Sequence, residues 1–573
     1  MPSKGSNPAI TLATLLLVFV AGAGLPGLTS SSHYSVYFDR DDPSRLNHEA
    51  IQLEYGRGDS LIVLLDSKEG TFLDAERWFL LEDLADGLRQ LPDVSVVIAA
   101  SELNIGGVIE TPSGQLIPDR DALADHGRVF GLLLSDDATL AAVAVDIPLT
   151  DHRAQTALAR NAAVREVVDR FTRDSPVEAS YTGTLAMSAA YVDVVRSDLR
   201  VIMPMLLVTM FVLLGALLGG WRAIGAALPI GLLAVASAFG IAGWLSAELA
   251  AINTFAPIMI LSIGTAGCVH LLLHYQRLRA GGAPPSEAAV RARRQVMLPM
   301  SIANATTILG FLALLLSPSP PLRIVGYTVA AGVSVSWLLC VTLMPAMLAR
   351  LDPRGATALG MYPTLRSLVG FVTRRNTAIL VGAAAIGIIA AALVTQNRVS
   401  DSVLSYFPGS QPFTAATETA DRKLAGVTEL LIDLDAGEPS ALLSESQVRA
   451  VADYVAWLRD QPETVRVSSL LDSEVLRAAI DAQRLEALLS RAADRTVGQL
   501  ERREVNAERS RMLIAVHLEP LASGEIIEFE ARARAAAIGL IPGLDITTGG
   551  TNLIFAKLGE TNIRSMMLAL SFG

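Results

Sequence analysis

Seven long apolar stretches constrain this chain more than any other feature of its sequence. They lie near residues 8–28, 199–219, 223–246, 252–274, 297–317, 323–349 and 377–395. A bilayer core about 30 Å thick is crossed by roughly 20 apolar residues in an α-helix, so each stretch is long enough to span a membrane. An eighth apolar run begins near Arg564 and continues to Gly573. The sequence therefore predicts an α-helical, multi-pass membrane protein.

Charged side chains are few and unevenly distributed. They make up 18% of the chain, below the quarter typical of soluble domains, which argues against an ordinary soluble enzyme. Residues 31–198 contain 29 acidic and 14 basic side chains, residues 396–562 contain 25 and 17, and the remainder contains 3 and 15. The basic residues cluster in short connections that the positive-inside rule assigns to the cytoplasm. Both acidic blocks are then external. The net charge of −11 argues against a nucleic-acid partner, because such proteins neutralise phosphates with basic side chains.

The sequence repeats itself at a spacing of about two thirds of its length. The matched pairs are Asn7 and Asn376, Tyr37 and Tyr406, Pro43 and Pro412, the segments 60–66 and 429–435, and Gly183 and Gly550. Such a repeat decides the architecture. It predicts that one membrane span followed by one external domain occurs twice.

Two questions about the ends of the chain follow from the repeat. The first copy continues through five further spans, whereas the second stops within its first returning helix. We interpret the chain as a truncated twelve-span protein, with a natural seven-span protein as the alternative. The N-terminus also fits a cleavable signal peptide, with Lys4, the apolar run Leu12–Val20 and the small residues after it. The matching run at residue 377 favours a retained helix.

The external blocks carry alternating strand and helix patterns. In the first block we expect strands at 61–65, 94–99, 129–134, 140–147 and 178–182 and helices at 72–91 and 152–173. In the second we expect strands at 430–434, 465–470, 512–518 and 544–548, helices at 445–458 and 525–540, and a charged helical insertion near 473–504. This is the β-α-β-β-α-β order of a ferredoxin-like α+β domain.

These observations predict seven segments in chain order. They are a first span (1–28), a first external α+β domain (29–198), a bundle of five spans (199–349), a cytoplasmic linker (350–376), a seventh span (377–395), a second external α+β domain (396–562) and the start of an eighth span (563–573).

Sequence motifs of catalysis are absent. No Walker loop, HExxH or GxSxG pattern occurs, so we predict no enzyme activity, no cofactor and no metal site. The segment from Gly22 to Gly27 has GxGxxG spacing, but it ends a membrane helix and follows no strand, so it does not predict dinucleotide binding. Cys268 and Cys340 lie in apolar runs and are predicted to be buried.

Polar residues within the fourth and fifth spans are the candidate site, because such residues are costly in a membrane. His270 and His274 are four residues apart and share one helix face with Thr265 nearby. Asn304, Thr306 and Thr307 of the fifth span are candidate partners. An imidazole ring can change charge near neutral pH, so His270 is a candidate proton relay. The alternative is a neutral histidine that makes one interhelical hydrogen bond.

Several motifs resemble those of the resistance–nodulation–division superfamily. They are Gly264-Thr-Ala-Gly-Cys-Val-His270, Asn304-Ala-Thr-Thr-Ile-Leu-Gly-Phe311 and Leu343-Met-Pro-Ala-Met-Leu348. Within that superfamily they are similar to the predicted-exporter and mycobacterial-membrane-protein-large branch, whose six-span half is related to sterol-sensing domains. The resemblance implies an inner-membrane exporter of lipid-like or hydrophobic molecules. Exporters of this kind use an aspartate in the fourth span for proton coupling, and the matching position here holds Gly267.

The resemblance also sets the expected partners. Membrane lipids and a hydrophobic small-molecule substrate are implied, and a homo-oligomer and a periplasmic adaptor are open. The multi-pass chain is expected in the bacterial inner membrane with both large domains on the periplasmic side. A non-transporting lipid-sensing or protein-export accessory module is the alternative function.

Overall fold

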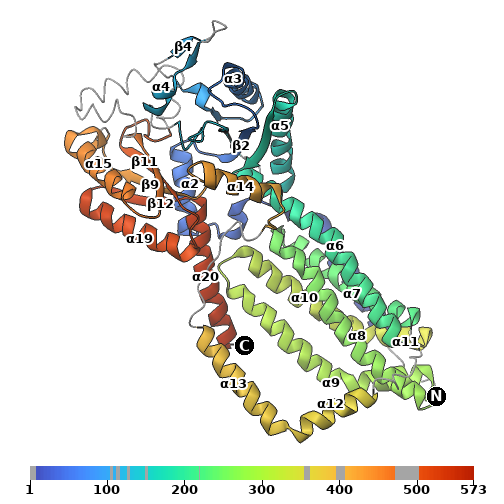
Figure 1. The fold of residues 1–573 in the computed structure, drawn as a ribbon. Coiled ribbons are helices and arrows are strands. Elements are labelled where there is room, and N and C mark those ends of the chain that lie inside the picture. Colours follow the sequence, from blue (N-terminus) through green and yellow to red (C-terminus); the bar gives the residue numbers. More distant parts are fainter. Residues whose placement is uncertain are drawn as a thin grey trace. The chain divides into compact units, whose positions relative to one another are not determined.

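The computed structural model describes residues 8–103, 108–110, 116–125, 129–148, 153–218, 220–353, 362–394, 407–439, 441–470 and 503–572 (Figure 1). The chain forms two discontinuous units. The helical unit contains Met1–Ser31, Val195–Arg398 and Asn562–Gly573, and the sheet unit contains Ser32–Val194 and Val399–Thr561. Nearly all of the charged insertion predicted near 473–504 lies outside the described residues.

The helical unit is built from long helices. They are α1 (Pro8–Gly22), most of α6 (Thr184–Leu218), α7 (Trp221–Trp244), α8 (Ala256–Ala280), α9 (Pro285–Leu312), α10 (Pro320–Thr342), α11 (Met344–Leu351), α12 (Tyr362–Arg374), α13 (Asn376–Val394) and the end of α20 (Thr551–Phe572). Two short parallel strands, β1 (Thr29–Ser30) and β8 (Glu248–Leu249), pair beside them.

Six segments of the described chain are long and apolar enough to cross a bilayer. They are Ala9–Gly27, Trp221–Trp244, Ala251–Ala280, Pro285–Leu316, Pro320–Thr342 and Asn376–Leu393. The chain is therefore a multi-pass helical membrane protein, as predicted. The expected sixth span is shorter than predicted, because the chain leaves α10 at Thr342 and begins α11 at Met344, with Pro345 in its first turn. Two further spans were expected, at 199–219 and after Arg564. Each includes residues whose side chains lie outside the described set, and both spans stay predictions.

Helices α1 and α7 approach each other through glycine. A Cβ atom on Gly243 would lie 1.9 Å from the carbonyl oxygen of Gly24, and one on Gly240 would lie 2.0 Å from that of Ala21. The Trp244 indole N–H donates to the carbonyl oxygen of Val20 at 3.0 Å. Small residues allow membrane helices to pack this closely. The glycine spacing at 22–27 therefore serves contact between helices.

The sheet unit contains two four-stranded antiparallel sheets. The first is formed by β2 (Asp59–Ser67), β3 (Val96–Ile98), β6 (Leu140–Ile147) and β7 (Val177–Thr182), with helices α3 (Ala75–Arg89) and α5 (Ala154–Thr172). The second is formed by β9 (Glu429–Asp435), β10 (Thr464–Ser468), β11 (Arg511–Leu518) and β12 (Asp545–Gly549), with α15 (Glu445–Arg459) and α19 (Ser523–Leu540). The strand orders are β3-β6-β2-β7 and β10-β11-β9-β12, so the two copies have the same topology.

Two residue pairs that matched in the sequence repeat and lie among the described residues occupy equivalent structural positions. Pro43 and Pro412 are the first residues of helices α2 (Pro43–Glu54) and α14 (Pro412–Lys423), where proline is favoured. Gly183 and Gly550 both have positive φ, at 96° and 117°, directly before α6 and α20. A Cβ atom on either would lie within 2.6 Å of a carbonyl oxygen on the first strand of its own copy.

The two copies exchange helices. Helix α2 of the first copy packs on the second sheet, where Ile51 and Tyr55 contact Leu431 and Leu513. Helix α14 of the second copy packs on the first sheet, where Ala416 contacts the cluster around Leu64. Each copy therefore covers part of the other, and the two copies form one compact unit. The sequence did not predict α2 or α14.

One predicted strand, Val129–Leu134, is wrong. The segment forms a tight turn, because Gly131 has a φ of 80° and its N–H donates to the carbonyl oxygen of Leu134 at 2.7 Å. Val129 and Leu134 are fully buried. Their apolar character reflects burial and not strand alternation. The turn contacts the second copy, since Arg466 donates to the carbonyl oxygen of Phe130 at 2.7 Å.

Three short elements complete the described part of the first copy. Strands β4 (Val108–Glu110) and β5 (Leu116–Pro118) pair with each other, and helix α4 (Arg120–Asp125) follows them.

Candidate functional site

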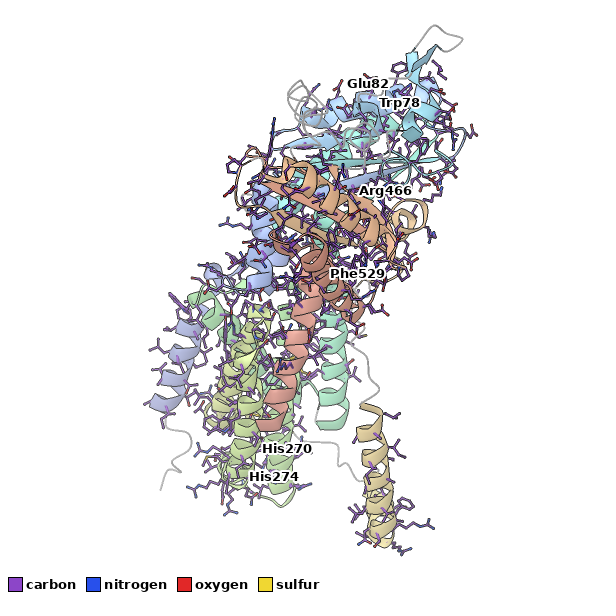
Figure 2. All side chains as sticks on the ribbon, turned by 90° about the vertical axis from the view of Figure 1, so that its left-hand side faces the viewer. Trp78, Glu82, His270, His274, Arg466 and Phe529 are labelled. Atoms are coloured by element: carbon purple, nitrogen blue, oxygen red, sulfur yellow. The ribbon has the colours of Figure 1, made fainter. Side chains whose placement is uncertain are left out.

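His270 and His274 lie on α8 in the helical unit (Figure 2). His270 is exposed on the surface of the bundle. The ring Nδ1 of His274 lies 3.0 Å from the carbonyl oxygen of His270, so His274 bonds to its own helix. The Thr265 hydroxyl donates to the sulfur of Met210 on α6 at 2.9 Å. Thr265 therefore contacts a neighbouring helix, but not through a titrating group.

The candidate partners on α9 also bond within their own helix. Asn304 donates to the carbonyl oxygen of Met300 at 2.8 Å. Thr306 and Thr307 both donate to the carbonyl oxygen of Ala303, at 2.8 Å and 2.9 Å. Within the described part of the chain, no hydrogen bond joins the His270 ring to these three side chains. In the described part of the chain, hydrogen bonds therefore do not join the predicted site residues into one polar cluster.

Gly267 lies on the inner side of α8. A Cβ atom there would lie 3.6 Å from the sulfur of Met300 and 3.9 Å from that of Cys340. Cys268 and Cys340 are buried and free, with their sulfur atoms 3.2 Å apart, which agrees with the predicted burial. The two side-chain atoms nearest to that Cβ position, outside the turn of α8 that contains Gly267, are therefore both sulfur.

An acidic side chain anchors the end of α8 to the end of α11. Asp352 accepts two hydrogen bonds from the Arg279 guanidinium, both at 2.7 Å, and one from the Tyr275 hydroxyl at 2.7 Å. Two parallel N–H···O bonds give such an arginine–carboxylate pair a fixed geometry. The sequence placed Asp352 only within the predicted linker 350–376. The signal available for its role was a single acidic residue beside a cluster of basic residues.

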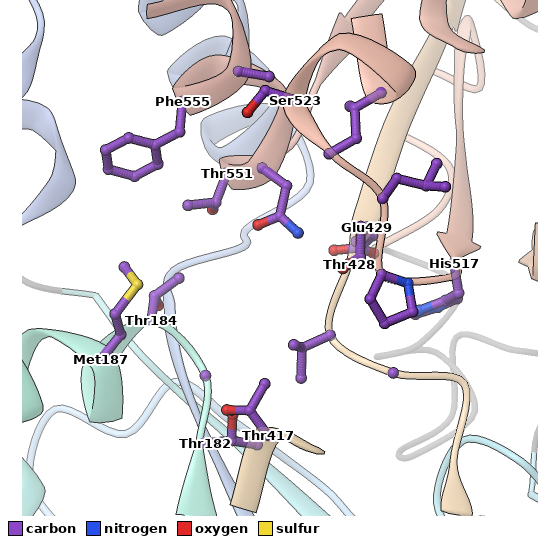
Figure 3. A pocket seen from close by; sticks show the side chains of 18 of the residues that line it. Thr182, Thr184, Met187, Thr417, Thr428, Glu429, His517, Ser523, Thr551 and Phe555 are labelled. Carbon is purple, nitrogen blue, oxygen red and sulfur yellow. The ribbon is translucent and has the colours of Figure 1, made fainter. Parts of the chain in front are cut away.

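The sheet unit contains a large cavity of about 530 Å³ lined by both copies (Figure 3). We call it the large cavity. Its apolar lining includes Ile62, Met187, Phe413, Val427, Ile526 and Phe555. Hydroxyl groups of Thr182 and Thr417 face each other at 2.7 Å on its wall. A mainly apolar lining with a few polar groups is typical of a site for a hydrophobic small molecule.

A second cavity of about 290 Å³ adjoins the large cavity and shares Ser60, Ile62, Gly426, Glu429, His517 and Thr551 with it. We call it the polar cavity, because five charged side chains line it: Arg57, Asp146, Glu429, Arg503 and Glu504. Arg57 donates to Glu429 at 3.0 Å, and Arg503 forms an ion pair with Asp146. Burial alone would raise the pKa of Glu429, but Arg57 and His517 outweigh it and hold that pKa below its usual range.

The sequence repeat contained an unused signal for the two cavities. Ser60 and Glu429 are paired by the repeat, as are Gly183 and Gly550, and all four lie where the copies meet. Equivalent residues of a duplicated domain meet near its pseudo-symmetric centre. Pairs in the repeat were therefore candidates for a shared wall, although no chemical motif marks them.

The topology and apolar helices define the class: a multi-pass helical membrane protein with a duplicated, sheet-containing unit. The MMPL family model matches residues 45–379, which is more than half of the sequence, and the chain belongs to the MMPL family. This agrees with the resemblance noted in the sequence.

Three relatives are similar to parts of the chain. Hopanoid transporter HpnN of Burkholderia multivorans is 23% identical over 438 residues, covering 72% of this chain and 48% of that protein. Hopanoid transporter HpnN of Rhodopseudomonas palustris is 25% identical over 125 residues, covering 22% and 14%. Protein MJ1562 of Methanocaldococcus jannaschii is 26% identical over 185 residues, covering 32% and 42%. The chain thus spans less than half the length of each of these relatives.

Proposed function

We propose that the chain is a transporter of lipid-like molecules and that the large cavity is its substrate site. The observation that carries this proposal is the cavity of about 530 Å³ in the sheet unit, with its mainly apolar lining from both copies. Membership of the MMPL family and similarity to two hopanoid transporters support it. The same family and relatives favour transport over enzyme catalysis.

The proposal includes the placement of the chain. Both copies of the sheet unit are proposed to be ferredoxin-like domains on the periplasmic side of the inner membrane. The acidic charge of these blocks and the basic connections between spans support this orientation. Membrane lipids are then the immediate partners. A homo-oligomer and a periplasmic adaptor stay predictions.

Proton coupling is the finer part of the proposal. Gly267 has no titrating group, and the charged side chains within α8 are Arg277 and Arg279 in its last turn. His270 is the remaining candidate relay within that span, and its exposed position on the bundle leaves its ring accessible to a proton donor outside the described chain. Thr265, Asn304, Thr306 and Thr307 are proposed only as its polar surroundings.

The alternative is a module that binds lipid without moving it. A lipid-binding cavity serves either role, so transfer must be measured directly. We propose reconstituting the full chain in vesicles and following the transfer of a fluorescent lipid analogue, with and without a pH gradient. Transfer that depends on the gradient and is lost in His270→Ala would support the relay. Binding without transfer would favour the sensing module.

A blocking substitution tests the cavity itself. Val427 is half-buried on the cavity wall, so Val427→Trp is expected to fill the cavity and reduce lipid transfer at least tenfold, as the loss of most apolar contacts would. Val465→Trp is the matched control, because Val465 is 51% exposed on β10 and does not line the cavity. Equal transfer by the two variants would contradict the assignment of the site.

A further inference from the structure

The polar cavity has hydrogen-bond donors that no group of the described residues accepts. His48 is 3% exposed and lines this cavity. Its Nδ1 accepts a hydrogen bond from the Gly550 N–H at 3.2 Å, so the proton of the neutral ring is on Nε2. Burial lowers the pKa of His48 to about 4, which keeps the ring neutral at ordinary pH. The buried Nε2–H has no partner among the described residues.

A second unused donor comes from Arg57. Its Nη1 is bonded to Glu429, but its Nε–H is buried and unpaired among the described residues. Ser468 contributes a buried hydroxyl in the same state. Buried polar groups in native proteins almost always have a partner. A cavity with several such groups is therefore built to receive hydrogen-bond acceptors.

The charges of the cavity restrict the kind of acceptor. The guanidinium groups of Arg57 and Arg503 are already paired with Glu429 and Asp146, and Glu504 adds a third carboxylate to the lining. Among the described lining residues, both guanidinium groups are therefore already paired, and neither is left to balance an anionic ligand. A carboxylate or phosphate would be repelled, whereas an uncharged hydroxyl oxygen is accepted at no electrostatic cost.

We propose that the polar cavity binds the uncharged, hydroxyl-bearing head group of an amphiphile whose apolar part occupies the large cavity. The two cavities adjoin and share six lining residues, from Ser60 to Thr551, so the two ends of one molecule would lie on either side of these residues. This inference rests on the proposed transport of lipid-like molecules and adds the chemistry of the substrate's polar end. His48 and Arg57 are its recognition residues.

The test is equilibrium binding to the full chain in lipid nanodiscs, with four probes of equal chain length. They are 1-monododecanoylglycerol, methyl dodecanoate, dodecanoate and dodecyltrimethylammonium. We expect the glycerol ester to bind about tenfold more tightly than the methyl ester, because hydrogen bonds to a guanidinium and an imidazole are added. The two charged probes should bind no more tightly than the methyl ester.

Two conservative variants separate recognition from folding. Arg57→Lys retains the charge paired with Glu429 but has no Nε–H. His48→Asn retains an acceptor for the Gly550 N–H but has no Nε2–H. Each is expected to remove most of the tenfold preference for the glycerol ester and to leave methyl ester binding unchanged, with the unfolding temperature as a check on folding.

The outcomes distinguish the two proposals. Tighter binding of dodecanoate or of the ammonium probe would overturn the uncharged head group. No preference for the glycerol ester, or a preference unaffected by both variants, would mean that water alone occupies the polar cavity. After either result the methyl ester would still bind, and its binding would still be sensitive to Val427→Trp. The proposed function would therefore stand. Failure of all four probes to bind would overturn the proposed function as well.

Discussion

Replacing Gly243 with leucine is expected to separate α1 from α7 and to destabilise the helical unit by about 3 kcal/mol or more. The reason is the backbone contact at this position, where even a Cβ atom would lie 1.9 Å from the carbonyl oxygen of Gly24. Two backbones cannot adjust as a flexible side chain can. The hydrogen bond from Trp244 to Val20 would be lost with the contact.

The measurement is the thermal unfolding of the detergent-solubilised chain, combined with cross-linking between α1 and α7. Gly382→Leu is the matched control, because Gly382 lies in the exposed helix α13 and no atom lies within 4 Å of its Cβ position. The control should unfold like the original protein. An unchanged unfolding temperature and intact cross-linking in Gly243→Leu would show that α1 does not pack as described.

The second large effect is expected in the sheet unit, at Arg511. This side chain is 23% exposed and forms an ion pair with Asp433, which is fully buried and also accepts a hydrogen bond from Tyr55 of the other copy at 2.6 Å. Burial raises the pKa of Asp433 even though Tyr55 and Arg511 both favour the carboxylate. Removal of the guanidinium leaves this acid without its cation.

Arg511→Met is therefore expected to lower the free energy of unfolding by about 3–5 kcal/mol, the usual cost of breaking a buried ion pair. Chemical denaturation of the full chain would measure it. The double variant with Asp433→Leu should recover much of the loss, since no unpaired charge remains buried. Arg170→Met is the control, because Arg170 is 67% exposed and lies 4.0 Å from Glu166. A loss as small as that of the control would contradict the role of the Asp433 pair.

The sequence predicted those parts of the fold that a local pattern encodes. A run of apolar residues long enough to cross a bilayer is visible without knowledge of its neighbours, and six such runs are helices in the structure. Strands β2 and β9 were equally clear because their burial is nearly continuous along the strand. The segment 129–134 was wrong because one glycine with positive φ converts an apolar run into a turn.

The sites were less predictable, because they depend on contacts between distant residues. The polar cavity joins His48 and Arg57 with Glu429 and Arg503, and no sequence spacing relates these positions. Helix α2, which contains His48, packs on the second sheet, and Arg57, just after α2, donates to Glu429 of that sheet. Conversely, Asn304 and His270 belong to adjacent helices, yet Asn304 bonds to its own backbone. Sequence shows which polar residues are present and not which partner each one takes.

The sidedness of the sheet unit is the most direct test of the proposed transport pathway. Single cysteines are introduced by Arg170→Cys, Arg422→Cys and Arg291→Cys after both native cysteines are replaced by serine. The native side chains at these positions are 67%, 68% and 59% exposed, and they lie in the first copy, the second copy and the start of α9. A membrane-impermeant maleimide should label positions 170 and 422 in intact cells and position 291 only after permeabilisation. Labelling of position 291 in intact cells, with both sheet-unit positions protected, would contradict the account.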